Sequence, residues 1–231
     1  MTINRPSSHL RIIVIGTALF IGAVAPTLAQ HYTSGHADVS GSACRPISEK
    51  NSEIGCYTLI RQPLGVLPQQ PLFWDIDTFP TRSAAEAEKA PRGSVVEAFG
   101  KVWLLTIAER GWRPQGGERV AEIGPIPLQQ ATGFTAMYME ATFEPGGLVA
   151  PHRHSGPELW YTLSGEQCLE TPKGKIVARA GDTTIIPGYT PMALLATGHE
   201  IRRSLVLILH DSAEPAATYL QDWSPKGLCG K

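Results

Sequence analysis

Residues 146–165, GGLVAPHRHSGPELWYTLSG, decide both the fold and the site. Residues two apart on a β-strand point to the same face of the sheet, so His152 and His154 present both imidazoles to one side. The Ser-Gly-Pro turn at 155–157 then allows Glu158 to return its carboxylate toward the same point. Two neutral imidazoles and one carboxylate are ligands for divalent iron, manganese, zinc or nickel, with positions left open for water or substrate. The stretch therefore predicts a metal site of His152, His154 and Glu158.

The flanking sequence is a series of short apolar or alternating runs separated by turns. Such runs at about ten-residue spacing are typical of a β-sandwich or barrel. One short helix is expected after Thr81, with Ser83 and Glu86 forming a capping box and Pro91 ending the run. A candidate second helix lies at 213–220. The predicted strands are 95–96, 102–105, 137–143, 159–163, 176–180, 183–186, 192–196 and 205–209.

The opening stretch resembles the first motif of the cupin family, Gly-x5-His-x-His-x3-Glu-x6-Gly. Every fixed position of that motif is occupied, by Gly146, His152, His154, Glu158 and Gly165. The resemblance extends over residues 134–210 and implies the family's all-β fold, a double-stranded β-helix or jelly-roll barrel. In the family, the two histidines and the glutamate of this motif are metal ligands.

The second cupin motif, Gly-x5-Pro-x-Gly-x2-His-x3-Asn, is matched only in part, by Gly181 and Pro187. Tyr189 stands where the family has glycine, and Met192 stands where it has the fourth ligand, a histidine. The asparagine position holds Ala196. A thioether is a soft, weak ligand for divalent iron or manganese. Two interpretations therefore stay open, a three-ligand metal site and a degenerate cupin that binds no metal.

The lining of the barrel follows from the alternation of side chains along a strand. If Glu158 points inward, Trp160 and Thr162 do too, while Leu159, Tyr161 and Leu163 pack outward against another layer. Trp160, Thr162 and Met192 are accordingly the candidate pocket residues, although Trp160 also suits plain core packing. His199 and His210 fall inside the barrel region, but a lone histidine is more often structural or exposed than a ligand. An acidic substrate would suit any of three arginines, Arg179, Arg202 and Arg203. Because arginines are mostly solvated, however, no role is assigned to them.

Composition is that of a globular protein, with 231 residues of which 42% are hydrophobic and 18% charged. Twenty Lys and Arg stand against 21 Asp and Glu, so no excess charge points to nucleic acid or to an anionic membrane. The expected organisation is one domain with extensions. Its parts are a signal peptide (1–29), an N-terminal arm (30–56), an extension with the first barrel strands (57–125), the cupin barrel (126–212) and a C-terminal tail (213–231).

The first residues read as an export signal. Arg5 and Arg11 form a basic start, residues 12–25 are apolar, and small residues up to Ala29 suit cleavage there. The apolar stretch is shorter than the roughly 20 residues of a membrane span, so no stable insertion is expected after cleavage. An uncleaved N-terminal anchor is the alternative. The predicted location is the periplasm or the extracellular space.

Export allows the four cysteines to pair, because disulfides persist in oxidising compartments. Cys44 and Cys56 bracket a polar stretch, and a bridge between them would contribute about 3 kcal/mol. Cys168 and Cys229 would then tie the C-terminus to the barrel. Sequence alone permits three pairings, so this one is a preference, and a free buried thiol at Cys168 is the alternative.

Three functions remain open on the sequence. The first is a metal-dependent enzyme acting on a small organic molecule, and the resembled family includes oxygenases, isomerases and decarboxylases. The second is a metal-free cupin that serves as a small-molecule binding module. The third is a structural partner in an assembly, suggested only by the long arm. A homodimer is expected by analogy with the family.

Overall fold

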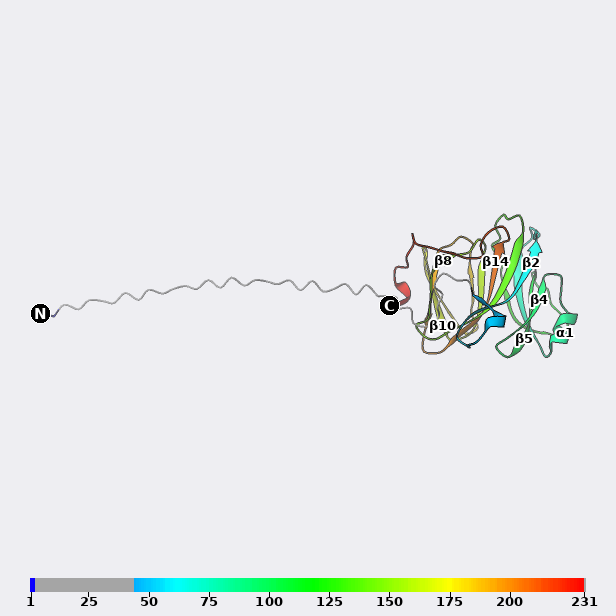
Figure 1. The fold of residues 1–231 in the computed structure, drawn as a ribbon, viewed down its shortest axis with the longest axis horizontal. Helices are drawn as coiled ribbons and strands as arrows, with labels where there is room; N and C mark the ends of the chain where they lie inside the picture. The colour runs from blue at the N-terminus through cyan, green and yellow to red at the C-terminus, as the bar shows by residue number, and fades with distance from the viewer. Residues whose placement is uncertain (3–43, 231) are drawn as a thin grey trace. The chain divides into compact units, whose positions relative to one another are not determined.

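The computed structural model describes residues 1–2 and 44–230 (Figure 1). Residues 3–29 of the predicted signal peptide and residues 30–43 of the predicted arm lie outside the described residues. Within the described part, no helix has the length and apolar character needed to cross a bilayer. Almost all regular structure is β, which confirms the all-β prediction.

The strands form three sheets, which Figure 1 shows as successive layers from β8 and β10, through β14 and β2, to β4 and β5. The six-stranded sheet contains, in spatial order, β1 (Arg45–Pro46), β2 (Gly55–Gly65), β7 (Phe134–Phe143), β14 (Arg202–Asp211), β9 (Glu158–Ser164) and β12 (Thr183–Ile186). The five-stranded sheet contains β11 (Gly174–Arg179), β10 (Glu166–Thr171), β13 (Met192–Thr197), β8 (Leu148–Arg153) and β15 (Thr218–Tyr219). The four-stranded sheet contains β4 (Gly93–Ala98), β5 (Lys101–Glu109), β3 (Leu72–Phe79) and β6 (Glu118–Ile123).

The six-stranded and five-stranded sheets enclose the barrel core. Along β7 and β14, every second side chain points into this core, so residues such as Met137, Met139 and Val206 face the opposite sheet. Leu169 and Leu194 meet them from β10 and β13. Alternation with a period of two thus divides each central strand between two apolar layers.

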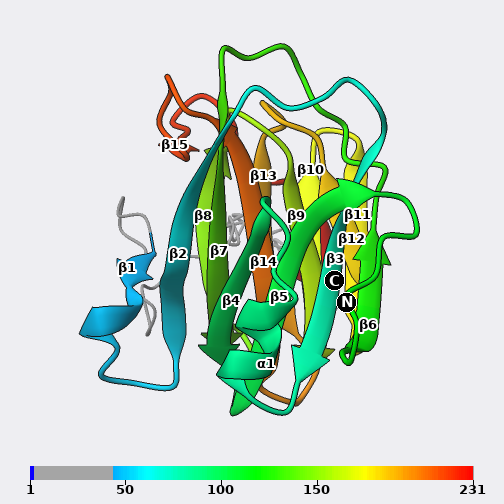
Figure 2. The ribbon, with the colours of Figure 1, turned by 90° about the vertical axis from the view of Figure 1, so that its right-hand side faces the viewer.

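The other face of the six-stranded sheet packs against the four-stranded sheet. Tyr138, Leu205 and Leu207 belong to the same buried cluster as Trp74 and Trp103. Figure 2, turned by 90°, shows β3, β4 and β5 in front of β7, β14 and β9. Leu159 is buried in this cluster, and Tyr161 and Leu163 pack against it, as the alternation on β9 predicted.

The segment 57–125, expected to hold the first barrel strands, divides between two layers. β2 joins the six-stranded sheet beside β7, whereas β3 to β6 form the separate four-stranded sheet. No strand was predicted at β3 from the sequence, yet seven of its eight residues are buried. The barrel therefore carries a covering sheet made by the residues that precede it.

The short helix α1 (Arg82–Ala87) is present, but its predicted capping box is wrong. Thr81 is the N-cap, with an extended backbone, and its hydroxyl accepts a hydrogen bond from the Ala84 N–H at 3.2 Å. Ser83 already lies inside the helix, so its side chain cannot cap the first turn. At 213–220 the structure has the short strand β15 in place of a second α-helix. The other helical elements described are single 3₁₀ turns, η1 (Ile47–Glu49) and η2 (Leu228–Gly230).

Both preferred disulfides are present in the structure, Cys44–Cys56 and Cys168–Cys229. The second joins β10 to the C-terminal tail. The Glu170 carboxylate accepts hydrogen bonds from the backbone N–H groups of Lys226 and Leu228, the latter at 2.8 Å. The tail is thus fixed to the outside of the five-stranded sheet by one covalent bond and several hydrogen bonds.

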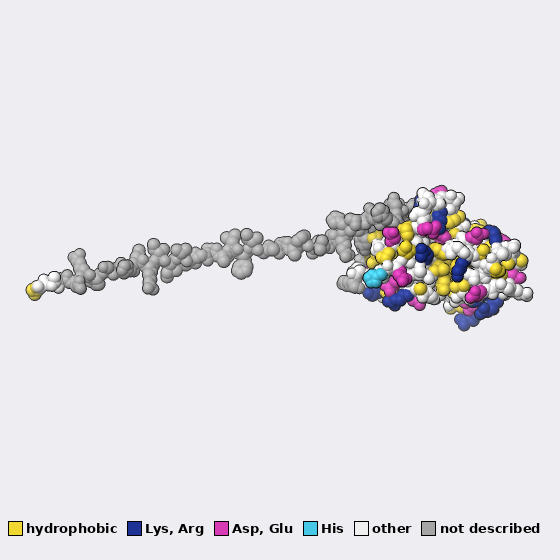
Figure 3. All heavy atoms as spheres, turned by 90° about the horizontal axis from the view of Figure 1, so that it is seen from below, with side chains coloured by type: hydrophobic (Ala, Val, Ile, Leu, Met, Phe, Trp, Pro, Cys, Tyr) yellow, Lys and Arg dark blue, Asp and Glu magenta, His cyan; other side chains and the backbone are white. Residues whose placement is uncertain are grey.

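The surface carries charges of both signs. Figure 3 shows basic and acidic side chains interspersed with apolar ones on the face seen there. The formal net charge of the chain is −1.

Candidate metal centre

The three predicted ligands come from the two ends of one turn. His152 lies on β8, His154 directly follows that strand, and Glu158 begins β9. The turn packs directly on β14. The approach is so close that a Cβ atom at Gly156 would overlap the Leu209 carbonyl oxygen. Glycine is therefore required at this point, and the close approach holds both ends of the turn over the barrel interior.

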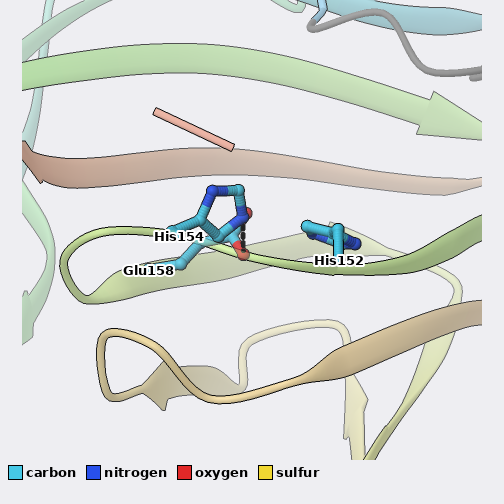
Figure 4. A group of neighbouring side chains, drawn as sticks. All are labelled: His152, His154 and Glu158. Atoms are coloured by element: carbon cyan, nitrogen blue, oxygen red, sulfur yellow. Dashed lines mark ion pairs between the residues drawn. The ribbon is translucent and has the colours of Figure 1, made fainter. Parts of the chain in front are cut away.

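The three side chains converge. One donor atom from each of His152, His154 and Glu158 lies within 4.8 Å of the others. The Nε2 atom of His154 is 2.9 Å from the Oε2 atom of Glu158, and Figure 4 shows His152 beside this pair. All three residues are buried, with exposed fractions of 7%, 4% and 5%. Such an arrangement places three ligands on one side of an ion and leaves the opposite side open.

Backbone carbonyls fix the orientation of both imidazole rings. The Nδ1 of His152 lies 2.8 Å from the Ala150 carbonyl oxygen, and the Nδ1 of His154 lies 2.6 Å from that of Ala216. A carbonyl oxygen only accepts, so each Nδ1 carries a hydrogen and donates it. In the neutral ring the Nε2 lone pair is then free. Metal-binding histidines are held in this way by a second contact at the other ring nitrogen.

Burial and charge set the protonation of the group. Burial lowers the pKa of His152, and the neighbouring His154 lowers it further, so His152 is neutral at neutral pH. Burial also acts to lower the pKa of His154, but the Glu158 carboxylate outweighs it and raises that pKa. The Nε2 of His154, 2.9 Å from the Oε2 of Glu158, is therefore the atom of this group that is favoured to carry an additional proton. A divalent cation would take the place of that proton, because metal binding to such sites releases protons.

A cavity of about 70 Å³ adjoins the three ligands. Its wall is mainly apolar and includes Trp160, Met137, Phe143 and Leu194. Ala217 and Tyr219 of the C-terminal tail also line it. At about 10–15 Å³ for one water, the volume suits a molecule of about five heavy atoms.

One of the three predicted pocket residues lines the cavity, and the other two do not. Trp160 lines the cavity. Met192 and Thr162 are buried, at 1% and 0% exposure, but neither is part of the cavity wall. Met192 pairs with His152 across β13 and β8, and side chains of such a pair share one face of the sheet. Thr162 lies four residues beyond Glu158 on β9, toward the other end of the barrel.

The loop of the second motif contacts the ligand turn despite its changed residues. Tyr189, at the position where the family has glycine, adopts a positive φ of 58°. Its N–H donates to the carbonyl oxygen of His154 at 2.7 Å, and its hydroxyl donates to Glu214 at 2.7 Å. A left-handed conformation costs a non-glycine residue about 1 kcal/mol. The loop thus supports the ligand turn through a residue that is less suited than glycine to this conformation.

Two further polar residues face the barrel interior. His210 is buried on β14, its Nδ1 donates to the Asp211 carbonyl, and it lies outside the three-residue group. Arg202, to which no role was assigned from the sequence, lines the cavity. The alternation on β14 contains the signal, since 202, 204, 206, 208 and 210 share a face. His199 is exposed in a loop.

Residues 139–208 match the family model described as Cupin domain. No curated protein matches the chain. Among solved structures, the chain is similar to a cupin superfamily protein from Desulfitobacterium hafniense, with 22% identity, covering 33% of this chain and 68% of that one, at a TM-score of 0.31. A protein with a double-stranded β-helix domain from Klebsiella pneumoniae is 17% identical, covering 42% and 79%, at a TM-score of 0.34. The DMSP lyase DddQ from Ruegeria pomeroyi is 22% identical, covering 40% and 45%, at a TM-score of 0.33.

Proposed function

We propose that this chain, which contains a cupin domain at residues 139–208, is a metal-dependent enzyme that acts on a small organic molecule in the barrel cavity. One observation carries the proposal, the convergence of the His152 and His154 imidazoles with the Glu158 carboxylate. Three buried polar groups in an apolar barrel need a partner that satisfies them together, and a divalent cation does so.

The residues present fit such an ion. Two nitrogen donors and one oxygen donor suit Fe, Mn, Zn or Ni, and the Ala150 and Ala216 carbonyls orient the nitrogen donors. When bound, the ion would polarise a carbonyl or hydroxyl group of the substrate. The apolar wall excludes water around that group, and Trp160 limits the size of the molecule beside it. Oxygenase, isomerase and decarboxylase chemistry all remain compatible with this site.

Metal content tests the proposal. Purified protein is expected to bind close to one divalent ion per chain, measured by elemental mass spectrometry after incubation with each candidate metal and removal of excess. His152→Ala is expected to weaken binding by more than about a hundredfold, because loss of an orienting contact alone typically costs 10- to 100-fold. His199→Ala, in an exposed loop, is the matched control and is expected to retain the ion.

A protein that stays metal-free, or whose metal content His152→Ala leaves unchanged, would contradict the enzyme proposal. That result would favour the alternative, a small-molecule binding module, because the apolar cavity remains without the ion. The disulfides support export to the periplasm or beyond as part of the same proposal, since such bonds persist in oxidising compartments.

Met192→His is expected to lower the Kd for the metal by about tenfold, by adding a fourth ligand, which would be the third nitrogen donor. The reason is the register, in which Met192 and His152 form a cross-strand pair. Ala193→His is the control, because residue 193 points to the opposite face of β13. Isothermal titration with the same metal distinguishes them. Equal affinities for wild type and Met192→His would show that position 192 does not reach the site.

A further inference from the structure

Arg202 is an arginine buried in the barrel interior. It begins β14 and is 0% exposed. It lines the same cavity as His152, His154 and Glu158. Arginine is seldom buried without a partner that neutralises it, so its surroundings decide its role.

The hydrogen bonds of Arg202 are incomplete. Its Nη2 donates to the Oε1 of Gln167 on β10. Neither its Nε nor its Nη1 has a hydrogen-bond partner among the described residues. The guanidinium carbon lies 5.4 Å from the centre of the Phe143 ring, which is an apolar contact with some cation–π character. Two donors of a buried cation therefore remain available.

The charge of Arg202 is only distantly balanced. Burial lowers its pKa to about 9, so the guanidinium stays positive at neutral pH. Glu158 is the acidic residue whose charge acts on it, and no ion pair to Arg202 is found within the described part of the chain. An uncompensated buried charge costs several kcal/mol.

Other polar atoms accumulate at this end of the barrel. Ser204 and Thr162 are paired across β14 and β9, and both hydroxyls are buried. These hydroxyls, and the Nε2 of Gln167, lack hydrogen-bond partners among the residues that the structure describes. The barrel thus has a ligand group of two imidazoles and a carboxylate at one end and a cationic polar group at the other.

We propose that Arg202 binds the carboxylate of a small organic acid, which places the rest of the acid against the His152, His154 and Glu158 group. A carboxylate accepts charge-assisted hydrogen bonds from a guanidinium and supplies the missing negative charge. The cavity volume of about 70 Å³ and its apolar wall limit the acid to a short, mostly aliphatic one. The inference deepens the proposed function by naming the substrate class, and it rests on that function only for the role of the metal.

The summed charge of the cavity lining favours an anionic substrate when the divalent metal ion is bound. Among the cavity-lining residues, Glu158 contributes −1 and Arg202 contributes +1. A divalent ion would leave the lining at +2, and a monocarboxylate would reduce this to +1. A neutral substrate would leave the excess uncompensated in an apolar barrel, where charge is expensive.

Propionate and propionamide test the inference without any mutation. The two molecules have the same shape and number of heavy atoms, and differ in charge at neutral pH. Propionate is expected to bind the wild-type protein at least about tenfold more tightly, corresponding to about 1.4 kcal/mol. Isothermal titration at constant ionic strength measures both. Equal binding of the two, or binding of neither, would overturn the inference.

Arg202→Met tests the residue. Methionine is uncharged and of similar length, so the variant is expected to lose at least about tenfold in propionate affinity and to keep its metal content. Its unfolding midpoint without ligand is expected to be no lower than that of the wild type, because removing an unpaired buried charge is often neutral or stabilising. If Arg202 had a purely structural role, Arg202→Met would leave the propionate affinity unchanged and would lower the unfolding midpoint. Should Arg202→Met fail to fold, Arg202→Lys keeps the charge with altered geometry and is expected to retain part of the preference for propionate over propionamide.

The outcomes separate this inference from the proposed function. Arg202-dependent propionate binding to a protein that takes up no metal would sustain the anion site and refute the metal enzyme. Stoichiometric metal with propionate affinity unchanged by Arg202→Met would sustain the metal site and refute the anion site. His152→Ala, expected to lack metal, should still bind propionate more tightly than propionamide if Arg202 provides the charge.

Discussion

Replacing both Cys168 and Cys229 with serine is expected to lower the free energy of unfolding by about 4 kcal/mol, mainly by releasing a constraint on the unfolded chain. The bond joins residues 61 positions apart, and closing a longer loop removes more entropy from the unfolded state. The tail that it holds also supplies the Ala216 carbonyl, which orients His154. Metal affinity is therefore expected to fall together with stability.

Denaturant unfolding of the doubly substituted protein, followed by tryptophan fluorescence, measures the first effect, and metal titration measures the second. The Cys44–Cys56 pair is the control, since its residues are only 12 positions apart and its removal is expected to cost about 3 kcal/mol. A smaller loss for Cys168 and Cys229 than for the control pair would contradict the expectation that the longer loop gives the larger stabilisation.

Trp74→Ala is expected to lower the free energy of unfolding by about 4 kcal/mol, within the range for a fully buried tryptophan. Trp74 is 0% exposed on β3 and belongs to the cluster that joins the four-stranded and six-stranded sheets. Its ring lies 6.2 Å from that of Tyr138 on β7, measured between centres. Alanine would leave a cavity between the two layers, at the core that they share.

Val66→Ala is the control for this variant, because Val66 is 78% exposed and a substitution there is expected to change stability by less than about 0.5 kcal/mol. Denaturant midpoints for both variants, with the slope of the transition, provide the comparison. A loss below about 1 kcal/mol for Trp74→Ala would show that the four-stranded sheet is not part of the cooperative unit.

The barrel was predictable because its signals are local. Alternation on 158–163 assigned the inward and outward faces of β9, and the His-x-His spacing placed two imidazoles on one face. Two strands that were not predicted, β3 and β10, lack a clear alternation of apolar and polar residues. β3 carries Asp75 and Asp77, which are buried in an ion pair with Arg119, 44 and 42 residues away in sequence. β10 carries Gln167 and Glu170, which are buried by partners distant in the chain.

The role of Arg202 could not be predicted for a similar reason. The sequence shows an arginine before a strand, and most arginines in that position are solvated. Its burial depends on β10 and β7, which bring Gln167 and Phe143 to its guanidinium. Likewise, the support of His154 comes from Ala216, 62 residues later, and no local pattern marks a backbone carbonyl as a hydrogen-bond acceptor.

That separation has a consequence for which part of the chain completes the site. All three ligands precede the segment 215–220, which contacts Ser155, His154 and β8 through Pro215, Ala216 and β15. A chain truncated after residue 212 would contain every strand of the six-stranded sheet, while the ring of His154 would lack its carbonyl. Completion of the metal-ready site therefore requires docking of the C-terminal segment and cannot be achieved by the ligands alone.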